Sequence, residues 1–197
     1  MEKDQSALID EVIKTRRTVK PDRMSGGKIP DEEMQEILEL ADWAPTHART
    51  EPWRFVVYGG VQVARFCQSH ADLYKTNSEP GTFLQAKYDN LAHIGDLVSH
   101  IAVCSMLRVP SHKIPEIEEI AAAASAIQNV LLGATSRGIA SFWSTGGMTH
   151  HPAFRDFFNL GDEDRIMGIL YFGYSRDPVK PGARMIPIDE KIKWIRE

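Results

Sequence analysis

The sequence has few of the features that mark membrane, disulfide-stabilised or metal-binding proteins. Its 197 residues include only two cysteines, Cys67 and Cys104, which lie far apart and outside any CxxC motif. This spacing predicts neither a disulfide framework nor a zinc site, and it suits a reducing compartment. No apolar run approaches the roughly 20 residues of a membrane span. We therefore expect a cytoplasmic protein with no membrane partner and no metal site.

The chain also lacks an excess of positive charge. Lys and Arg total 23 against 27 Asp and Glu, so the net charge is −4. Nucleic-acid binding needs a basic face, so we expect no nucleic-acid partner. The first ten residues, MEKDQSALID, are acidic and amphipathic, unlike a signal peptide. A chain of this length is most simply one domain, and we expect a single domain over residues 1–197.

Several catalytic and cofactor motifs are missing. The chain contains no GxGxxG or GxxxxGK[ST] phosphate loop and no GxSxG nucleophile motif. Its histidines are scattered, and the one adjacent pair, His150-His151, lacks the spacing of metal ligands on a helix. This pair is more typical of the exposed start of a helix.

Helices and strands are predicted in irregular alternation, which favours an α+β domain over a regular parallel array. The predicted helices cover residues 6–16, 31–43, parts of 61–96, 116–137 and a short segment from Pro152. The predicted strands cover residues 53–58, 97–107, 139–144 and 166–174. Gly138 stands where a left-handed helix cap is expected.

Two segments raise questions that the sequence leaves open. Residues 43–53, WAPTHARTEPW, place two tryptophans and two prolines in one connecting loop, which suggests a stiff wall against a flat apolar group. Residues 121–126, AAAASA, have no bulky side chain. They reflect either plain helix propensity or the close approach of another backbone or a flat ligand.

Cationic and glycine-rich segments supply the other hints. Arg16, Arg17, Thr18 and Lys20 stand where the first helix ends, and there they either face solvent or bind an anion. FWSTGG (142–147) ends a strand with a hydroxyl and two glycines, which permits backbone donors to approach a ligand. A second basic segment spans residues 180–184. Together, an anion site, a flat ring and close backbone donors describe a flavin nucleotide.

In this order, the motifs resemble the FMN-dependent nitroreductase family, especially its small single-domain members. The resemblance covers nearly the whole chain. It rests on RRT (16–18), the AP[ST]…PW loop (44–53), AIQNVLLGATSRGIASFW (126–143) and a GY pair (173–174) that precedes the basic tail.

The resemblance implies a nitroreductase-like α+β fold, with a central, mainly antiparallel sheet surrounded by helices. It also implies an intertwined homodimer and bound FMN. Arg16 and Arg184 would clamp the phosphate, Arg17 and Thr18 would bind the ribityl-phosphate end, and Lys20 would lie at the N1/O2 edge of the flavin. Trp143, Ser144, Thr145 and Gly146 would line the ring. Pro45, Thr46 and His47 would border a flavin held mainly by the partner subunit.

The implied activity is two-step oxidoreduction, in which NADH or NADPH reduces FMN and a small electron-poor acceptor, such as a nitroaromatic or a quinone, then reoxidises it. No side chain is expected to act as acid or nucleophile, and Lys20 acts electrostatically. A flavin dehydrogenase or dehalogenase of the same fold, a non-catalytic FMN carrier and an interaction domain without cofactor are the alternatives. The chain departs from the family at Arg49 and Glu51, where Asn and Gln are common. This pair would brace the loop as an ion pair or direct Arg49 to an anionic acceptor.

The C-terminal segment, residues 175–197, is predicted to cross to the partner subunit. Disordered tails are poor in large apolar side chains, but this one carries Ile192, Trp194 and Ile195 among its last six residues. Arg184 lies on its path.

Overall fold

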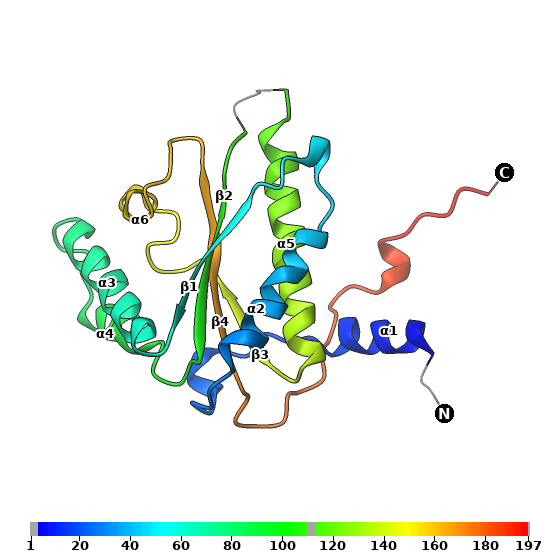
Figure 1. The fold of residues 1–197 in the computed structure, drawn as a ribbon, viewed down its shortest axis with the longest axis horizontal. Helices are drawn as coiled ribbons and strands as arrows, with labels where there is room; N and C mark the ends of the chain where they lie inside the picture. Colours follow the sequence, from blue (N-terminus) through cyan, green and yellow to red (C-terminus); the bar gives the residue numbers. More distant parts are fainter. Residues whose placement is uncertain (1–3, 110–112, 197) are drawn as a thin grey trace.

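The structure, a computed structural model, describes residues 4–109 and 113–196, and it places helices on both faces of a four-stranded sheet (Figure 1). The ends of the predicted domain and tail, residues 1–3 and 197, lie outside this description. The strands are β1 (Trp53–Gly59), β2 (His100–Met106), β3 (Ala140–Ser144) and β4 (Arg165–Gly173). The helices are α1 (Gln5–Thr15), α2 (Asp31–Glu39), α3 (Val61–Asn77), α4 (Gln85–His93), α5 (Glu116–Ser136) and α6 (Pro152–Phe157). The described residues also form four short 3₁₀ helices, η1 (Pro21–Arg23), η2 (Leu40–Trp43), η3 (His47–Arg49) and η4 (Ile188–Glu190).

The sheet has the strand order β1-β2-β4-β3, and every neighbouring pair is antiparallel. The prediction of an α+β fold with an antiparallel sheet is therefore confirmed. Beyond β3, Thr18 forms an isolated parallel bridge with Ser141. The segment after α1 thus extends the sheet at its β3 edge, which brings the first basic motif beside β3.

The core lies on both sides of the sheet because the central strands alternate their side chains between two covered faces. In β2, Ala102 and Cys104 pack toward α2 and α5, whereas Ile101 and Val103 pack toward α3, α4 and α6. All seven residues of β2 are buried. A strand covered on both faces has a continuous apolar run, which is the pattern the sequence shows.

Helix α5 is the longest element, and its end confirms the expected cap. Gly138 has φ +70°, its N–H donates to Thr135 O, and the N–H of Ile139 donates to Ala134 O. These two bonds form a Schellman motif. The small residues of α5 serve packing within the chain. Ala122, Ala123 and Ala126 are buried in the core, and a Cβ on Gly133 would lie 2.3 Å from Leu40 Cδ1 of η2.

The predicted helix over 31–43 is divided into α2 and the tighter η2. Ala44 is extended, with ψ 145°, because the ring of the following Pro45 disfavours helical geometry in the preceding residue.

Helix α1 and the C-terminal tail extend from the same side of the body (Figure 1). None of the α1 residues is buried, and Leu8, Ile9 and Ile13 are exposed. Beyond β4, the tail contains no buried residue over 175–196. Its crossing to a partner stays a prediction.

Candidate functional site

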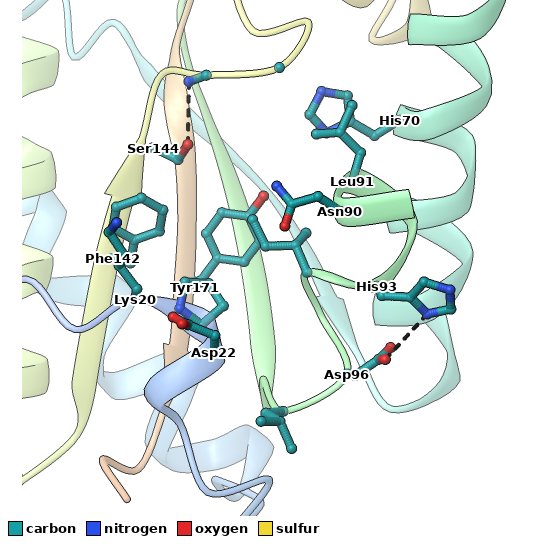
Figure 2. Close-up of a pocket in the computed structure, with 15 residues that line it drawn as sticks. Lys20, Asp22, His70, Asn90, Leu91, His93, Asp96, Phe142, Ser144 and Tyr171 are labelled. Carbon is teal, nitrogen blue, oxygen red and sulfur yellow. Dashed lines mark hydrogen bonds and ion pairs between the residues drawn. The ribbon is translucent and has the colours of Figure 1, made fainter. Parts of the chain in front are cut away.

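A cavity of about 770 Å³ lies beside the end of β3 (Figure 2). This volume is within the usual range of small-molecule sites. Its walls come from five elements that are distant in sequence, namely η1 with the residue before it, α3, α4, β3 and β4. The residues that matter most are Lys20, Asp22, His70, Asn90, Phe142, Ser144, Gly146 and Tyr171.

An aromatic pair forms one wall of this cavity. Phe142 of β3 stacks on Tyr171 of β4 with ring centroids 5.9 Å apart and an interplanar angle of 29°, because the two residues are partners in the strand register. Burial strongly raises the pKa of Tyr171, and the thiol of Cys67 adds to the shift. The phenol therefore stays neutral, and in Figure 2 its hydroxyl points toward the amide of Asn90. This wall offers a flat apolar surface with a neutral hydrogen-bonding edge.

The turn after β3 forms a second wall, and His70 holds it from behind. The N–H of Met148 donates to Nε2 of His70 at 2.9 Å. Gly147 has φ +68°, and a Cβ there would lie 2.6 Å from His70 Nε2, so only glycine fits. Burial, with a smaller contribution from Lys87, lowers the pKa of His70 to about 4. The ring is thus neutral near pH 7, and because Nε2 accepts, its proton is on Nδ1.

Strand alternation divides the predicted ring-lining residues between two sides of the sheet. Ser144 and Gly146 line the large cavity. Trp143 and Thr145 line a smaller hollow of about 220 Å³ on the other side, together with Arg16 and Thr18. The indole N–H of Trp143 donates to Met167 O at 2.9 Å, so this edge is already bonded within the chain.

The basic motif after α1 connects these hollows to a third one. Thr18 lines both the small hollow and a hollow of about 460 Å³ that also contains Arg17 and Lys180. Lys20 lines this third hollow and the large cavity. Arg16, Arg17, Thr18 and Lys20 therefore lie along one continuous rim.

Two buried polar atoms on this rim have no hydrogen-bond partner in the part of the chain that the structure describes. They are Nε of Arg17 and Oγ of Ser141. Nη1 of Arg17 donates to Arg16 O at 2.7 Å, and the guanidinium lies against Gly182, where a Cβ would come within 2.4 Å of Cζ. An unsatisfied guanidinium N–H and a hydroxyl are suitable donors for an anion. The donor set and the adjacent flat wall fit a ring that carries a phosphate.

The loop between α2 and β1 lies elsewhere. Pro45, Thr46 and His47 line none of these three hollows within the same chain. The two tryptophans of WAPTHARTEPW also differ in environment. Trp53 is buried in the core and its indole donates to Asp42 Oδ1, whereas Trp43 is 83% exposed.

The same loop stores backbone strain. Ala48, Arg49 and Glu51 have φ of 51°, 57° and 42°, a region that costs non-glycine residues of order 1–3 kcal/mol each. No ion pair joins Arg49 to Glu51 among the described residues, so bracing of the loop by such a pair is not observed. The bracing comes instead from Thr46, whose Oγ1 is 2.9 Å from Thr50 Oγ1 and accepts from the N–H of Glu51.

Arg184 also lies apart from the rim. It is on the exposed tail, and its Nη1 donates to Ala183 O at 3.0 Å. Among the predicted site residues, one chain thus brings together Arg16, Arg17, Thr18, Lys20, Trp143, Ser144, Thr145 and Gly146, and leaves the 45–47 loop and Arg184 outside.

Sequence reasoning missed His70, Asn90 and Tyr171. Each stands in a segment whose pattern predicts only an ordinary helix or strand. Phe142 lies within the FWSTGG segment but was not singled out, although a two-residue strand period places it on the same face as Ser144.

The sequence model of the nitroreductase family matches residues 13–174. The chain belongs to the nitroreductase family. This confirms the predicted family and the predicted class of enzyme, an oxidoreductase of the nitroreductase type.

Individual nitroreductases resemble the chain over its whole length. A nitroreductase-like family protein from Bacillus cereus is 28% identical, with a TM-score of 0.84 and full coverage of both chains. YfhC of Bacillus subtilis, provisionally named an NAD(P)H nitroreductase, is 26% identical over 95% of this chain and 94% of its own. The FMN-dependent nitroreductase NfnB from Mycobacterium smegmatis, solved with NADPH, shares the fold at 17% identity and a TM-score of 0.76, covering 98% and 100% of the two chains.

Two negative observations concern only the described residues. No helix in residues 4–109 and 113–196 is long and apolar enough to cross a membrane. The same residues contain no group of three or more His, Cys, Asp or Glu side chains able to hold a metal ion.

Proposed function

We propose that this nitroreductase is an FMN-dependent oxidoreductase that uses NADH or NADPH to reduce nitroaromatics, quinones or similar electron-poor acceptors. The observation that carries the proposal is the basic rim of Arg16, Arg17 and Lys20 beside a cavity with an aromatic wall. A phosphate and a flat ring are the two chemical groups that this arrangement suits, and FMN contains both.

The residues would divide along the cofactor according to their position. Arg16 and Thr18 would hold the phosphate end, with Trp143 and Thr145 beside them on the same side of β3. Arg17 would reach the phosphate from the adjoining hollow. Lys20, Ser144 and Gly146 would contact the ring from the large cavity. Held by these residues, FMN would supply the hydride-transfer chemistry between the nicotinamide nucleotide and the acceptor.

The protein's contribution is then mainly electrostatic and geometric. The ammonium of Lys20 favours a ring that carries negative charge. His70 keeps the 144–149 turn in one conformation, because it accepts from Met148 and lies directly against Gly147. The open volume of the cavity leaves room to stack a flat acceptor against the ring, and such positioning accounts for most of the expected rate enhancement.

The proposed enzyme is a homodimer. A second copy of the chain would cover an exposed apolar groove on the first. This groove is lined mainly by Leu8, Ile9, Val12, Ile13, Leu40, Trp43 and Leu132. Burying each exposed side chain fully would contribute roughly 1.5–3 kcal/mol. In the dimer, the 45–47 loop and Arg184 would reach the rim of the partner subunit, which accounts for their separation from the rim of their own chain. Two buried free cysteines, Cys67 and Cys104, suit the cytoplasm.

Cofactor content and half-reactions test the proposal. The purified protein should be yellow and should release FMN, not FAD, when denatured. Anaerobic stopped-flow mixing with NADH and with NADPH should bleach the flavin, and a nitroaromatic or quinone should restore the colour. Lys20→Ala should keep FMN, slow its reduction and lower its potential.

The outcomes separate the alternatives. A colourless protein that FMN cannot reconstitute would contradict the proposal. FMN binding without reduction by either nucleotide would indicate a carrier. Reduction without turnover across a panel of nitroaromatics and quinones would indicate a dehydrogenase or dehalogenase for one particular metabolite.

A further inference from the structure

His47 makes a contact that the sequence did not suggest. Its Nδ1 lies 2.5 Å from Oε2 of Glu118, a residue 71 positions away in the first turn of α5. The contact joins the strained loop before β1 to the longest helix of the fold. Glu118 is therefore the residue that ties the loop to a rigid element.

The contact determines which nitrogen of His47 stays available. An ionised carboxylate can only accept hydrogen bonds, so Nδ1 of His47 must donate to it. This leaves Nε2 without a role inside the contact. The imidazole is held at one end by Glu118 and presents the other end outward, and 58% of the side chain is exposed.

The loop itself is built to keep this orientation. Ala48 and Arg49, the two residues after His47, have positive φ, and the Thr46 and Thr50 hydroxyls close the loop around them. Strained backbone persists only where the surroundings enforce it, and it concentrates at functional sites. A surface loop without function would have little reason to hold a histidine in this way.

We propose that Glu118 is a positioning residue that orients His47 so that Nε2 faces the flavin ring bound by the partner subunit. This inference rests on the proposed FMN dimer. Glu118 does not itself touch the ring. It acts through His47 by fixing both the direction of the imidazole and the nitrogen that carries the proton.

The simpler interpretation is that His47 and Glu118 form an ordinary surface ion pair, and that Glu118 also interacts favourably with the helix dipole. Helix α5 contains a matched control residue that tests this interpretation. Glu116 lies in the same first turn and contacts Arg165 Nε at 2.9 Å. The exposure of its side chain, 41%, is close to the 43% of Glu118. Any effect due only to a negative charge at this helix start should be equal for Glu116→Gln and Glu118→Gln.

The experiment compares Glu118→Gln, Glu116→Gln, His47→Gln and the double variant Glu118→Gln/His47→Gln in the dimeric holoenzyme. The first readout is FMN affinity from fluorescence titration. The second is the ¹⁵N shift pattern of His47, assigned by its loss in His47→Gln, which reports whether Nδ1 or Nε2 carries the proton. The third is the visible spectrum and reduction potential of the bound flavin.

We expect Glu118→Gln to weaken FMN binding at least about threefold, in the range found for coupled neighbours. It should also shift the flavin spectrum and remove the Nδ1–H preference of His47. The double variant should be no weaker than His47→Gln alone, whereas Glu116→Gln should match the parent.

Two results would overturn the inference. One is equal behaviour of the two glutamine variants, and the other is additive losses in the double variant. A parent protein that binds no FMN would refute the proposed function and this inference together. A parent that binds FMN but shows no effect at Glu118 would refute this inference alone.

Discussion

Strand β2 and the C-terminal tail are both rich in apolar residues, yet their environments are opposite. All seven residues of β2 are buried, whereas Ile192, Trp194 and Ile195 of the tail are 47%, 72% and 86% exposed. The strand lies between two helical layers that cover both of its faces. No element in the described part of the chain buries the residues of the tail. Apolar composition alone therefore does not make a core, and the exposed residues retain burial energy that a partner can use.

Removal of the tail should have the largest effect on the protein. A chain ending at Ser175 should lose dimerisation and FMN together, because it loses the apolar residues of the tail and also Arg184. Size-exclusion chromatography with detection in the flavin absorption band measures both effects.

The core of the truncated chain should remain folded, since none of the described tail residues is buried. Its far-UV circular dichroism should therefore be close to that of the parent. A truncated protein that is still dimeric and yellow would show that the tail is dispensable and that the apolar groove alone suffices.

The stability of the buried core depends in part on an ion pair. Glu119, 1% exposed, is bonded to the guanidinium of Arg108. Glu119→Gln should lower the free energy of unfolding by about 3–5 kcal/mol, because it leaves a buried cation without its counter-charge. Urea denaturation measures this loss. Glu116→Gln, three residues earlier and only half-buried, should cost less than about 1 kcal/mol. Equal effects of the two substitutions would contradict the assignment of the pair to the core.

The contrast also shows which parts of the fold the sequence could predict. The strand at 100–106 and the cap at Gly138 follow from local patterns, a continuous apolar run and a glycine after a long helix. The exposure of α1 does not, because an amphipathic stripe has the same pattern whether its own chain or a partner covers it.

The candidate site was harder to predict than the fold. Its basic rim follows from short motifs, but its walls depend on pairings between distant segments. His70 meets Met148 across 78 positions, and Tyr171 meets Phe142 only through the strand register. Strand alternation is the one sequence signal that separates Trp143 from Ser144, because neighbouring residues of a strand point to opposite faces of the sheet.

Acid should weaken the interior selectively through His70. Burial lowers its pKa to about 4 in the folded state, against roughly 6.5 in the unfolded chain. Between these values only the unfolded chain binds the proton, so stability falls as the pH drops from about 6.5 to 4, by roughly 3 kcal/mol in all.

The difference between two histidines tests this pH dependence. Denaturation at several pH values measures this effect. Below about pH 6.5, the free energy of unfolding should fall less steeply for His70→Gln than for the parent. His150→Gln, an exposed position directly after the 144–149 turn, should behave like the parent. If the pH dependence of the unfolding free energy is the same in His70→Gln as in the parent, other groups cause the acid sensitivity.

The proposed phosphate clamp connects the two regions, because Arg16 belongs to the body and Arg184 to the tail. Arg16→Ala and Arg184→Ala should each weaken FMN binding by about one order of magnitude, since a charge-assisted hydrogen bond is worth roughly 1.5–3 kcal/mol. Arg65→Ala, on the exposed side of α3, is the control and should bind FMN normally. If both arginine variants keep the affinity of the parent, the assignment is wrong.

The smallest effect is expected in the strained loop, where Arg49 and Glu51 stand in place of the amides common in the family. Asn tolerates left-handed backbone geometry better than arginine does. Arg49→Asn with Glu51→Gln should therefore retain FMN and gain less than about 1 kcal/mol of stability, because Arg49 has φ 57°. Its acceptor profile should change, since a cation is removed from the loop that is proposed to face the partner's site. Anionic nitroaromatics should lose more kcat/KM than neutral ones. The single variants Arg49→Asn and Glu51→Gln separate the contributions of the two residues. Arg49→Asn alone should account for the change in preference between anionic and neutral acceptors. Equal kinetics on neutral and anionic acceptors before and after the exchange would show that the pair only shapes the loop.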